Sequence, residues 1–148
     1  MPTRDLIVTV ANQLYEHSNM ALSIRCDPAL PMPGFSLVET DHGGLRRPTV
    51  IVNPDILPAC PHVVAHVMSH EWGHHYHRHL NPEGPDKAPR RASTPEERRL
   101  KELEADSYAA GFVKARGYDI RAIEAFMREH PVDLEERLRV LQDTPASR

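Results

Sequence analysis

The sequence predicts an α+β domain in which a short, mostly antiparallel sheet is followed by helices. Segments with the alternating pattern of strands lie between residues 21 and 53. Helical spacing of apolar residues marks residues 4–18 and most of the chain after residue 61. A length of 148 residues with 40% hydrophobic side chains is enough for one core and leaves no room for a second. We therefore expect residues 1–148 to form a single domain.

The first half of the chain is expected to supply one helix and the sheet. Thr3 is a suitable N-cap for the helix over residues 4–18. Three strands are predicted, over residues 21–26, 35–40 and 48–53. The turn at 41–44 makes the last two strands a hairpin. The strand at 48–53 directly precedes the principal helix, so we expect it to be an edge strand beside that helix. Its apolar run at 50–52 would equally suit a buried central strand.

The second half of the chain is expected to be helical. Four helices are predicted, over residues 61 to about 80, 95–116, 120–129 and 134–142. Thr94 and Glu97 form a capping box at the start of the second, and Asp119 caps the third. Asp133 and Glu136 are expected to form a capping box for the last helix.

The net charge, the apolar runs and the cysteines indicate which partners and which cellular compartment to expect. The net charge of −3 gives no indication of a nucleic-acid or acidic-lipid partner. The apolar run from Leu6 to Ala11 is too short to span a bilayer and short for a signal peptide, so a cytoplasmic location is expected. Cys26 and Cys60 are then expected to be reduced, small buried side chains, although a disulfide between them stays open. The oligomeric state also stays open.

The principal helix carries the motif His70-Glu71-Trp72-Gly73-His74, which reads HExxH. Residues four apart lie on the same face of an α-helix, so His70 and His74 can both bind one metal ion. Glu71 lies about 100° further round the helix, near enough to act on a water molecule at that metal. This pattern is typical of zinc-dependent peptidases, in which the glutamate is the general base.

A catalytic zinc site usually has three protein ligands, so a third must come from elsewhere in the chain. Glu102 and Asp106 are again four residues apart on a predicted helix. We expect Glu102 to be the third ligand of one zinc ion per chain. Asp106 is expected to accept the outer ring N–H of a ligand histidine and so to fix its tautomer.

The chain is rich in histidine, with 10 in total, so a second pair of histidines could bind the metal instead. His66 also lies four residues before His70, but no glutamate follows it directly. We therefore expect His66 to be a packed histidine or one at the edge of the solvent. His75 and His77 point to other faces and are expected to be exposed.

These residues resemble the gluzincin peptidases, and more closely the HtpX-like and CAAX prenyl protease-like family. His79 extends the motif to HExxHxxxxH, and the segment from Glu102 to Asp106 resembles the family's E-x-x-A-D box. The Gly-Tyr-Asp segment at 117–119 and the His130-Pro131 segment, followed by an arginine and a leucine, resemble later family motifs. The resemblance covers about residues 63–141. Small ImmA/IrrE-type peptidases are the nearest rival, because their size is closer.

The resemblance implies a zincin-like fold and a zinc-dependent peptidase, with a peptide or protein as substrate. His130, in the family-like His-Pro segment, is the first candidate to stabilise the oxyanion, followed by Tyr108, Tyr76 and Arg137. Substrate backbone is expected to pair with the edge strand.

Three questions stay open at the level of sequence. The loop at residues 81–93 could be a lid or a linker. A zinc-binding regulatory module without catalysis is the alternative function. A structural zinc site, closed by His66, His79 or a cysteine, is the third possibility.

Overall fold

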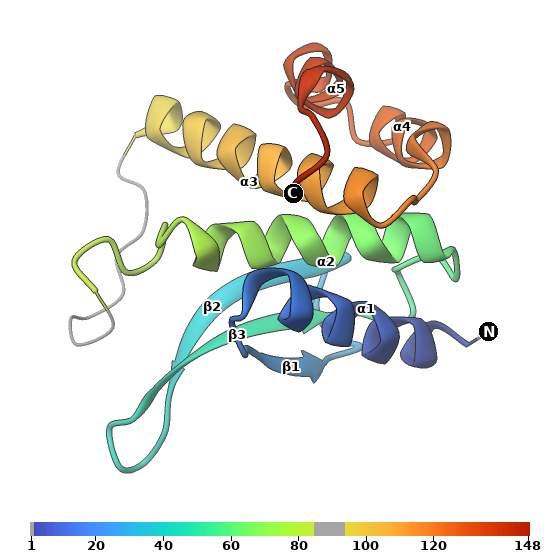
Figure 1. Cartoon of the computed structure of the whole chain (residues 1–148). Coiled ribbons are helices and arrows are strands. Elements are labelled where there is room, and N and C mark those ends of the chain that lie inside the picture. The colour runs from blue at the N-terminus through green and yellow to red at the C-terminus, as the bar shows by residue number, and fades with distance from the viewer. Residues whose placement is uncertain (1, 85–93) are drawn as a thin grey trace.

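The computed structural model describes residues 2–84 and 94–148, so the greater part of the expected loop at 81–93 lies outside the described residues. The elements in chain order are α1 (Thr3–Ser18), β1 (Ser23–Cys26), β2 (Gly34–Thr40), β3 (Arg46–Val52), α2 (Pro61–Tyr76), α3 (Pro95–Ala115), α4 (Ile120–Arg128) and α5 (Leu134–Asp143). The predicted α+β class is confirmed: a small mixed sheet precedes most of the helices (Figure 1).

The sheet has the order β1-β3-β2, so β3 is central and the prediction that it is the edge strand is wrong. β2 pairs antiparallel with the whole of β3, and β1 pairs parallel with its second half, from Thr49 to Val52. Those four residues are all buried, as expected for a strand with neighbours on both sides. Pro48 precedes them, in the part of β3 that pairs only with β2, where a missing N–H is tolerated. The edge strand that packs against α2 is β2.

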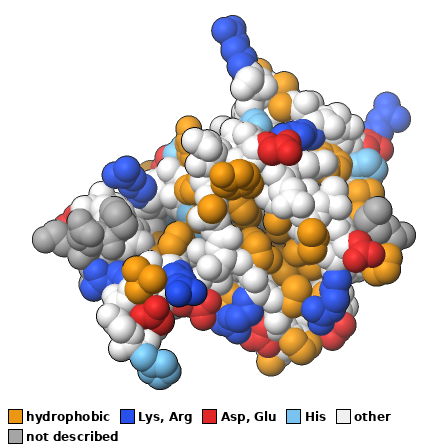
Figure 2. All heavy atoms as spheres, turned by 60° about the horizontal axis from the view of Figure 1, so that its bottom comes forward, with side chains coloured by type: hydrophobic (Ala, Val, Ile, Leu, Met, Phe, Trp, Pro, Cys, Tyr) orange, Lys and Arg blue, Asp and Glu red, His pale blue; other side chains and the backbone are white. Residues whose placement is uncertain are grey.

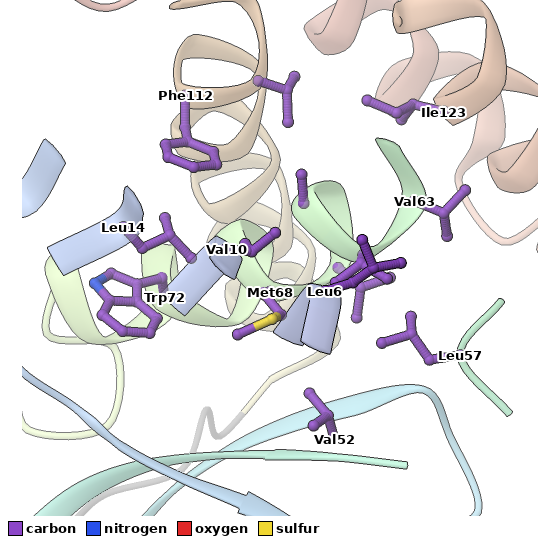
Figure 3. Close-up of a cluster of buried hydrophobic side chains, with 14 of the residues drawn as sticks. Leu6, Val10, Leu14, Val52, Leu57, Val63, Met68, Trp72, Phe112 and Ile123 are labelled. Atoms are coloured by element: carbon purple, nitrogen blue, oxygen red, sulfur yellow. The ribbon is translucent and has the colours of Figure 1, made fainter. Parts of the chain in front are cut away.

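α2 lies in the middle of the fold, between the sheet and α3, and runs antiparallel to α3 (Figure 1). Its apolar residues therefore contact neighbours on several sides. Figure 3 shows Met68 and Trp72 of α2 packed beside Val10 and Leu14 of α1, with Val52 of the sheet and Phe112 of α3 in the same cluster. All six of these side chains are almost completely buried. Because the core surrounds α2, the polar face of this helix is held in a fixed position.

The helix ends follow most of the sequence signals. Thr94 accepts a hydrogen bond from Glu97 N at 3.0 Å, and Asp119 accepts one from Arg121 N at 2.9 Å, so both predicted caps are confirmed. Asp133 is different: it lies in the left-handed region with φ 52° and its side chain caps nothing.

Glu136, the expected partner of Asp133, bonds instead to Arg99 of α3. Two other helix ends differ from the predictions. α1 begins at Thr3 itself, after Pro2. α2 ends at Tyr76, before the predicted end near residue 80.

Figure 2 shows the face on the sheet side of the molecule, where apolar side chains occupy the middle and charged side chains surround them. Exposed large apolar residues within the described ranges include Val8, Tyr15, Met32 and Ile56. No helix in the described part of the chain combines the length and the apolar character needed to cross a bilayer.

Candidate metal centre

α2 presents three potential metal ligands in one small volume. His70, Glu71 and His74 each offer a ligand atom, and these atoms lie within 4.8 Å of one another, close enough to hold a metal ion. The two imidazoles lie four residues apart on one face of the helix, with ring centroids 4.9 Å apart. The spacing of the HExxH motif thus produces a possible metal-binding group.

Glu102 of α3 approaches both imidazoles. Its Oε2 lies 2.8 Å from Nε2 of His70, and its Oε1 lies 3.2 Å from Nε2 of His74. Burial by itself would raise the pKa of Glu102, but hydrogen bonds from the two imidazoles outweigh it and hold the pKa well below its usual value. The carboxylate of Glu102 therefore bridges the Nε2 atoms of the two imidazoles.

The opposite side of the His70 ring is fixed by Asp106. Nδ1 of His70 lies 2.8 Å from Oδ1 of Asp106, whose side chain is buried. Arg137 of α5 donates two hydrogen bonds to the same carboxylate, from Nε at 2.7 Å and from Nη2 at 2.9 Å. The Nε2 atom of His70 is thereby directed towards Glu102.

The same contacts perturb the titration of this pair. Burial alone would lower the pKa of His70, but the hydrogen bonds to Asp106 and Glu102 raise it well above 6.5. Burial alone would raise the pKa of Asp106, but hydrogen bonds from Arg137 and His70 hold it well below 3.8. The carboxylate of Asp106 is thus charged at neutral pH.

Small residues allow α2 and α3 to approach closely beside the metal-binding group. A Cβ atom on Gly73 would lie 3.1 Å from both Cα and O of Ala105. Gly73 lies within HExxH, and Ala105 lies between Glu102 and Asp106. The two motifs therefore contact each other through backbone, which is what brings Glu102 to the imidazoles.

β2 supplies contacts to Glu71 that the sequence gave no reason to expect. Oγ of Ser36 lies 2.8 Å from the backbone oxygen of Glu71 and 2.9 Å from its Oε1, so the hydroxyl can donate to either. Gly34 packs directly on the same helix, because a Cβ there would lie 2.9 Å from Val67 and 3.3 Å from Cγ of Glu71. Ser36 and Glu71 are 35 residues apart, and no local pattern links them.

Two hollows border the metal-binding group. A groove of about 640 Å³ runs between β2 and α2 and is lined by residues 34–38 together with His70, Glu71, His74 and Glu102. A second pocket of about 180 Å³ lies towards α4 and is lined in part by His66, Phe126, Met127 and His130. Glu71 contributes to both hollows.

The four candidates for oxyanion stabilisation lie in different places. His130 borders the second pocket, where it is exposed, and its Nδ1 lies 3.2 Å from the backbone oxygen of Phe126. Arg137 borders the same pocket but its guanidinium is bonded to Asp106. Tyr76 and Tyr108 pack on each other, with ring centroids 4.9 Å apart. Tyr76 comes two residues after His74, about 200° round the helix, and so points away from the metal-binding group.

The remaining histidines near the motif also differ from one another. His66 is buried, and burial lowers its pKa to about 3, so the ring is neutral. His75 was predicted to be exposed, but it is partly buried and its Nε2 lies 2.9 Å from the backbone oxygen of Thr49, because β3 packs against α2 there. His77 is exposed, as predicted. Cys26 and Cys60 are both free.

No protein-family model, curated protein or solved structure matches this chain. The interpretation of the site therefore depends on its geometry and on the chemistry of its residues.

Proposed function

We propose that this chain is a zinc-dependent peptidase of the gluzincin type, with His70, His74 and Glu102 as zinc ligands. One observation carries the proposal: the Nε2 atoms of both imidazoles meet the carboxylate of Glu102, at 2.8 and 3.2 Å. Two histidines and one glutamate are a known ligand set of catalytic zinc sites. The groove beside these residues supports a reaction on a bound molecule rather than a purely structural role.

In this proposal Glu71 is the general base. His70, His74 and Glu102 would hold a zinc ion, which would supply Lewis acidity sufficient to lower the pKa of a water molecule to about 7. Glu71 accepts the proton of the attacking water and later donates it to the leaving amine. The hydroxyl of Ser36, 2.9 Å from Oε1 of Glu71, can donate a hydrogen bond that restrains this carboxylate.

The substrate in this proposal is an extended peptide lying along β2. One side of β2 pairs with β3, and the groove runs along this strand and past Glu71. Backbone N–H and C=O groups on the unpaired edge of a strand can bind an extended peptide by adding it to the sheet. β2 thus takes the place of β3 as the expected strand for substrate binding, because β3 pairs with a strand on each side. His130 borders the neighbouring pocket and stays the first candidate to bind the oxyanion.

The test compares the wild type with Glu71→Gln. Both proteins are loaded with zinc and incubated with a peptide library, and new N-termini are mapped by mass spectrometry. We expect one zinc per chain in both, and a loss of cleavage of at least about 100-fold in the variant. Glu135→Gln, which changes a side chain that is 90% exposed on α5, is the matched control and should cleave as the wild type does.

Two results would contradict the proposal. Undiminished cleavage by Glu71→Gln would exclude Glu71 as the base. A zinc-loaded wild type that cleaves no peptide would favour the regulatory zinc-binding module instead.

A further inference from the structure

The end of α2 folds back so that His79 lies on the ring of His74. The backbone N–H of His79 donates to O of His74 at 2.9 Å, and that of Arg78 donates to O of His75 at 3.1 Å. Arg78 lies in the left-handed region, with φ 56°. These are the two hydrogen bonds and the left-handed residue of a Schellman motif, which closes many helices. This motif brings the second residue after the C-cap, here His79, against the third residue from the helix end, here His74.

α3 ends in the same motif and provides a comparison within the molecule. The N–H of Tyr118 donates to O of Val113 at 2.9 Å, and that of Gly117 donates to O of Lys114 at 3.2 Å, with φ 76° at Gly117. Of the two residues brought together there, Val113 belongs to the hydrophobic core and Tyr118 packs against it, which is the usual arrangement.

In α2 the corresponding residues are His74 and His79, and their Nδ1 atoms lie 2.8 Å apart. The apolar contact of the ordinary motif is thus replaced by a hydrogen bond between two imidazoles. The left-handed position is held by Arg78, although a residue with a Cβ there costs about 1 kcal/mol or more. The five-residue interval from His74 to His79 is the one that this helix ending requires.

The contact constrains the tautomer of His74. A neutral imidazole that offers Nε2 to a metal carries its proton on Nδ1. Only one proton can lie between the two Nδ1 atoms, so when His74 donates, Nδ1 of His79 must accept. His79 then carries its own proton on Nε2, which lies 3.5 Å from Oε1 of Glu104. The His79 ring is buried, so water does not compete for the hydrogen bond between the two Nδ1 atoms.

The position of His79 is also fixed by its backbone. Nζ of Lys101 on α3 donates to O of His79 at 3.2 Å. Asp106 plays the equivalent part for His70, at 2.8 Å from its Nδ1. Each imidazole of the HExxH motif therefore has one partner on its Nδ1 side, a carboxylate for His70 and an imidazole for His74.

We propose that His79 is a positioning residue for the metal site: it accepts the Nδ1 hydrogen of His74 and so directs Nε2 of His74 at the metal. This inference rests on the proposed metal ligands but not on peptidase activity. His79, the last histidine of the HExxHxxxxH pattern, is then a partner of a metal ligand and not a ligand itself.

The test measures zinc affinity of the full chain by competition with a chromophoric chelator. His79→Leu removes the acceptor, and we expect zinc affinity to fall by about 10- to 100-fold, as for other partners of metal ligands. His79→Asn offers a side-chain oxygen close to the position of Nδ1 and should keep an affinity near the wild-type value. His77→Leu is the matched control, because it removes a neighbouring ring that stacks on His79 but makes no contact with Nδ1 of His74.

A spectroscopic measurement separates positioning from simple packing. In the zinc-loaded wild type, ¹⁵N shifts of the His74 ring should show a proton on Nδ1 and none on Nε2. His79→Asn should keep this pattern. Thermal unfolding of each variant in chelator reports folding separately from zinc binding.

Several outcomes would overturn the inference. One is an unchanged zinc affinity in His79→Leu. Another is an affinity in His79→Asn as low as in His79→Leu, since packing alone would then explain the effect. A wild type that binds no zinc would overturn both this inference and the proposed function. A wild type that binds zinc without cleaving peptides would overturn only the proposed function.

Discussion

Replacing Gly73 with alanine tests whether the metal-binding group depends on the close approach of α2 and α3. The new Cβ would lie 3.0 Å from Cβ of Tyr108 and 3.1 Å from Cα and O of Ala105. Backbone atoms of a helix cannot move independently, so the helices must separate. Ordinary contact begins at 3.4 Å, so the shortest of these contacts, to Cβ of Tyr108, requires a shift of about 0.4 Å (3.4 − 3.0). Overpacking of this kind typically costs about 1–3 kcal/mol.

Gly111 of α3 provides a matched control for the effect of alanine on a helix. It is also a buried glycine within a helix, but the nearest atom to a Cβ there is the terminal Oγ of the exposed Ser147, which can turn away. Both substitutions gain about 1 kcal/mol in helix propensity. The difference between their free energies of unfolding therefore isolates the cost of pushing α2 from α3.

The two variants are compared by urea denaturation in chelator and by competition for zinc. We expect Gly73→Ala to be less stable than Gly111→Ala by about 1–3 kcal/mol. We also expect it to bind zinc more weakly, because Glu102 on α3 moves away from the imidazoles of α2. Gly111→Ala should keep the wild-type affinity. Equal stability of the two variants together with an unchanged zinc affinity would refute this reasoning.

Three further predictions concern the partners of the site. Asp106→Asn should lower the free energy of unfolding by about 3 kcal/mol, because Arg137 loses its buried partner. The pKa of Asp106 in the folded protein lies below its usual value of 3.8. The extra stability of the wild type should therefore be complete above pH 3.8 and disappear as the pH falls through the folded-state pKa. A stability difference between the two proteins that persists in strong acid would contradict this prediction. Ser36→Ala should lower kcat about fivefold by freeing the carboxylate of Glu71, with zinc content unchanged, since one hydrogen bond contributes about 1 kcal/mol. Zinc competes with a proton on His70, whose pKa is raised above 6.5, so zinc affinity should fall as the pH is lowered through that raised value; a pH-independent affinity would exclude His70 as a ligand.

The sequence predicted the features that depend on neighbouring residues. The caps at Thr94 and Asp119 follow from the hydrogen bonds that short polar side chains make with the next turn, and both are confirmed. The spacing of His70 and His74 fixes both rings on one face of α2, whatever surrounds it. The cap at Asp133 failed because this residue has left-handed backbone, whereas an N-cap residue needs an extended one, and Glu136 has a partner on α3 that no local pattern reveals.

Pairing of the strands could not be read from the chain in the same way. The segment at 48–53 was placed at the edge of the sheet because it precedes α2, but the parallel addition of β1 makes it central. Adjacency in sequence does not decide which strand lies between the others. The free edge beside α2 consequently belongs to β2, which is further away along the chain.

The sequence by itself determined the pattern of His70, Glu71 and His74, because a helix turns by a constant angle at every residue. Only the tertiary structure decided that Glu102 reaches both imidazoles, that Ser36 bonds Glu71, and that His79 returns to His74. The first two contacts join residues about 30 apart through the packing of separate elements. The third is local, but it depends on a left-handed turn at Arg78, a residue type that gives no signal for that conformation.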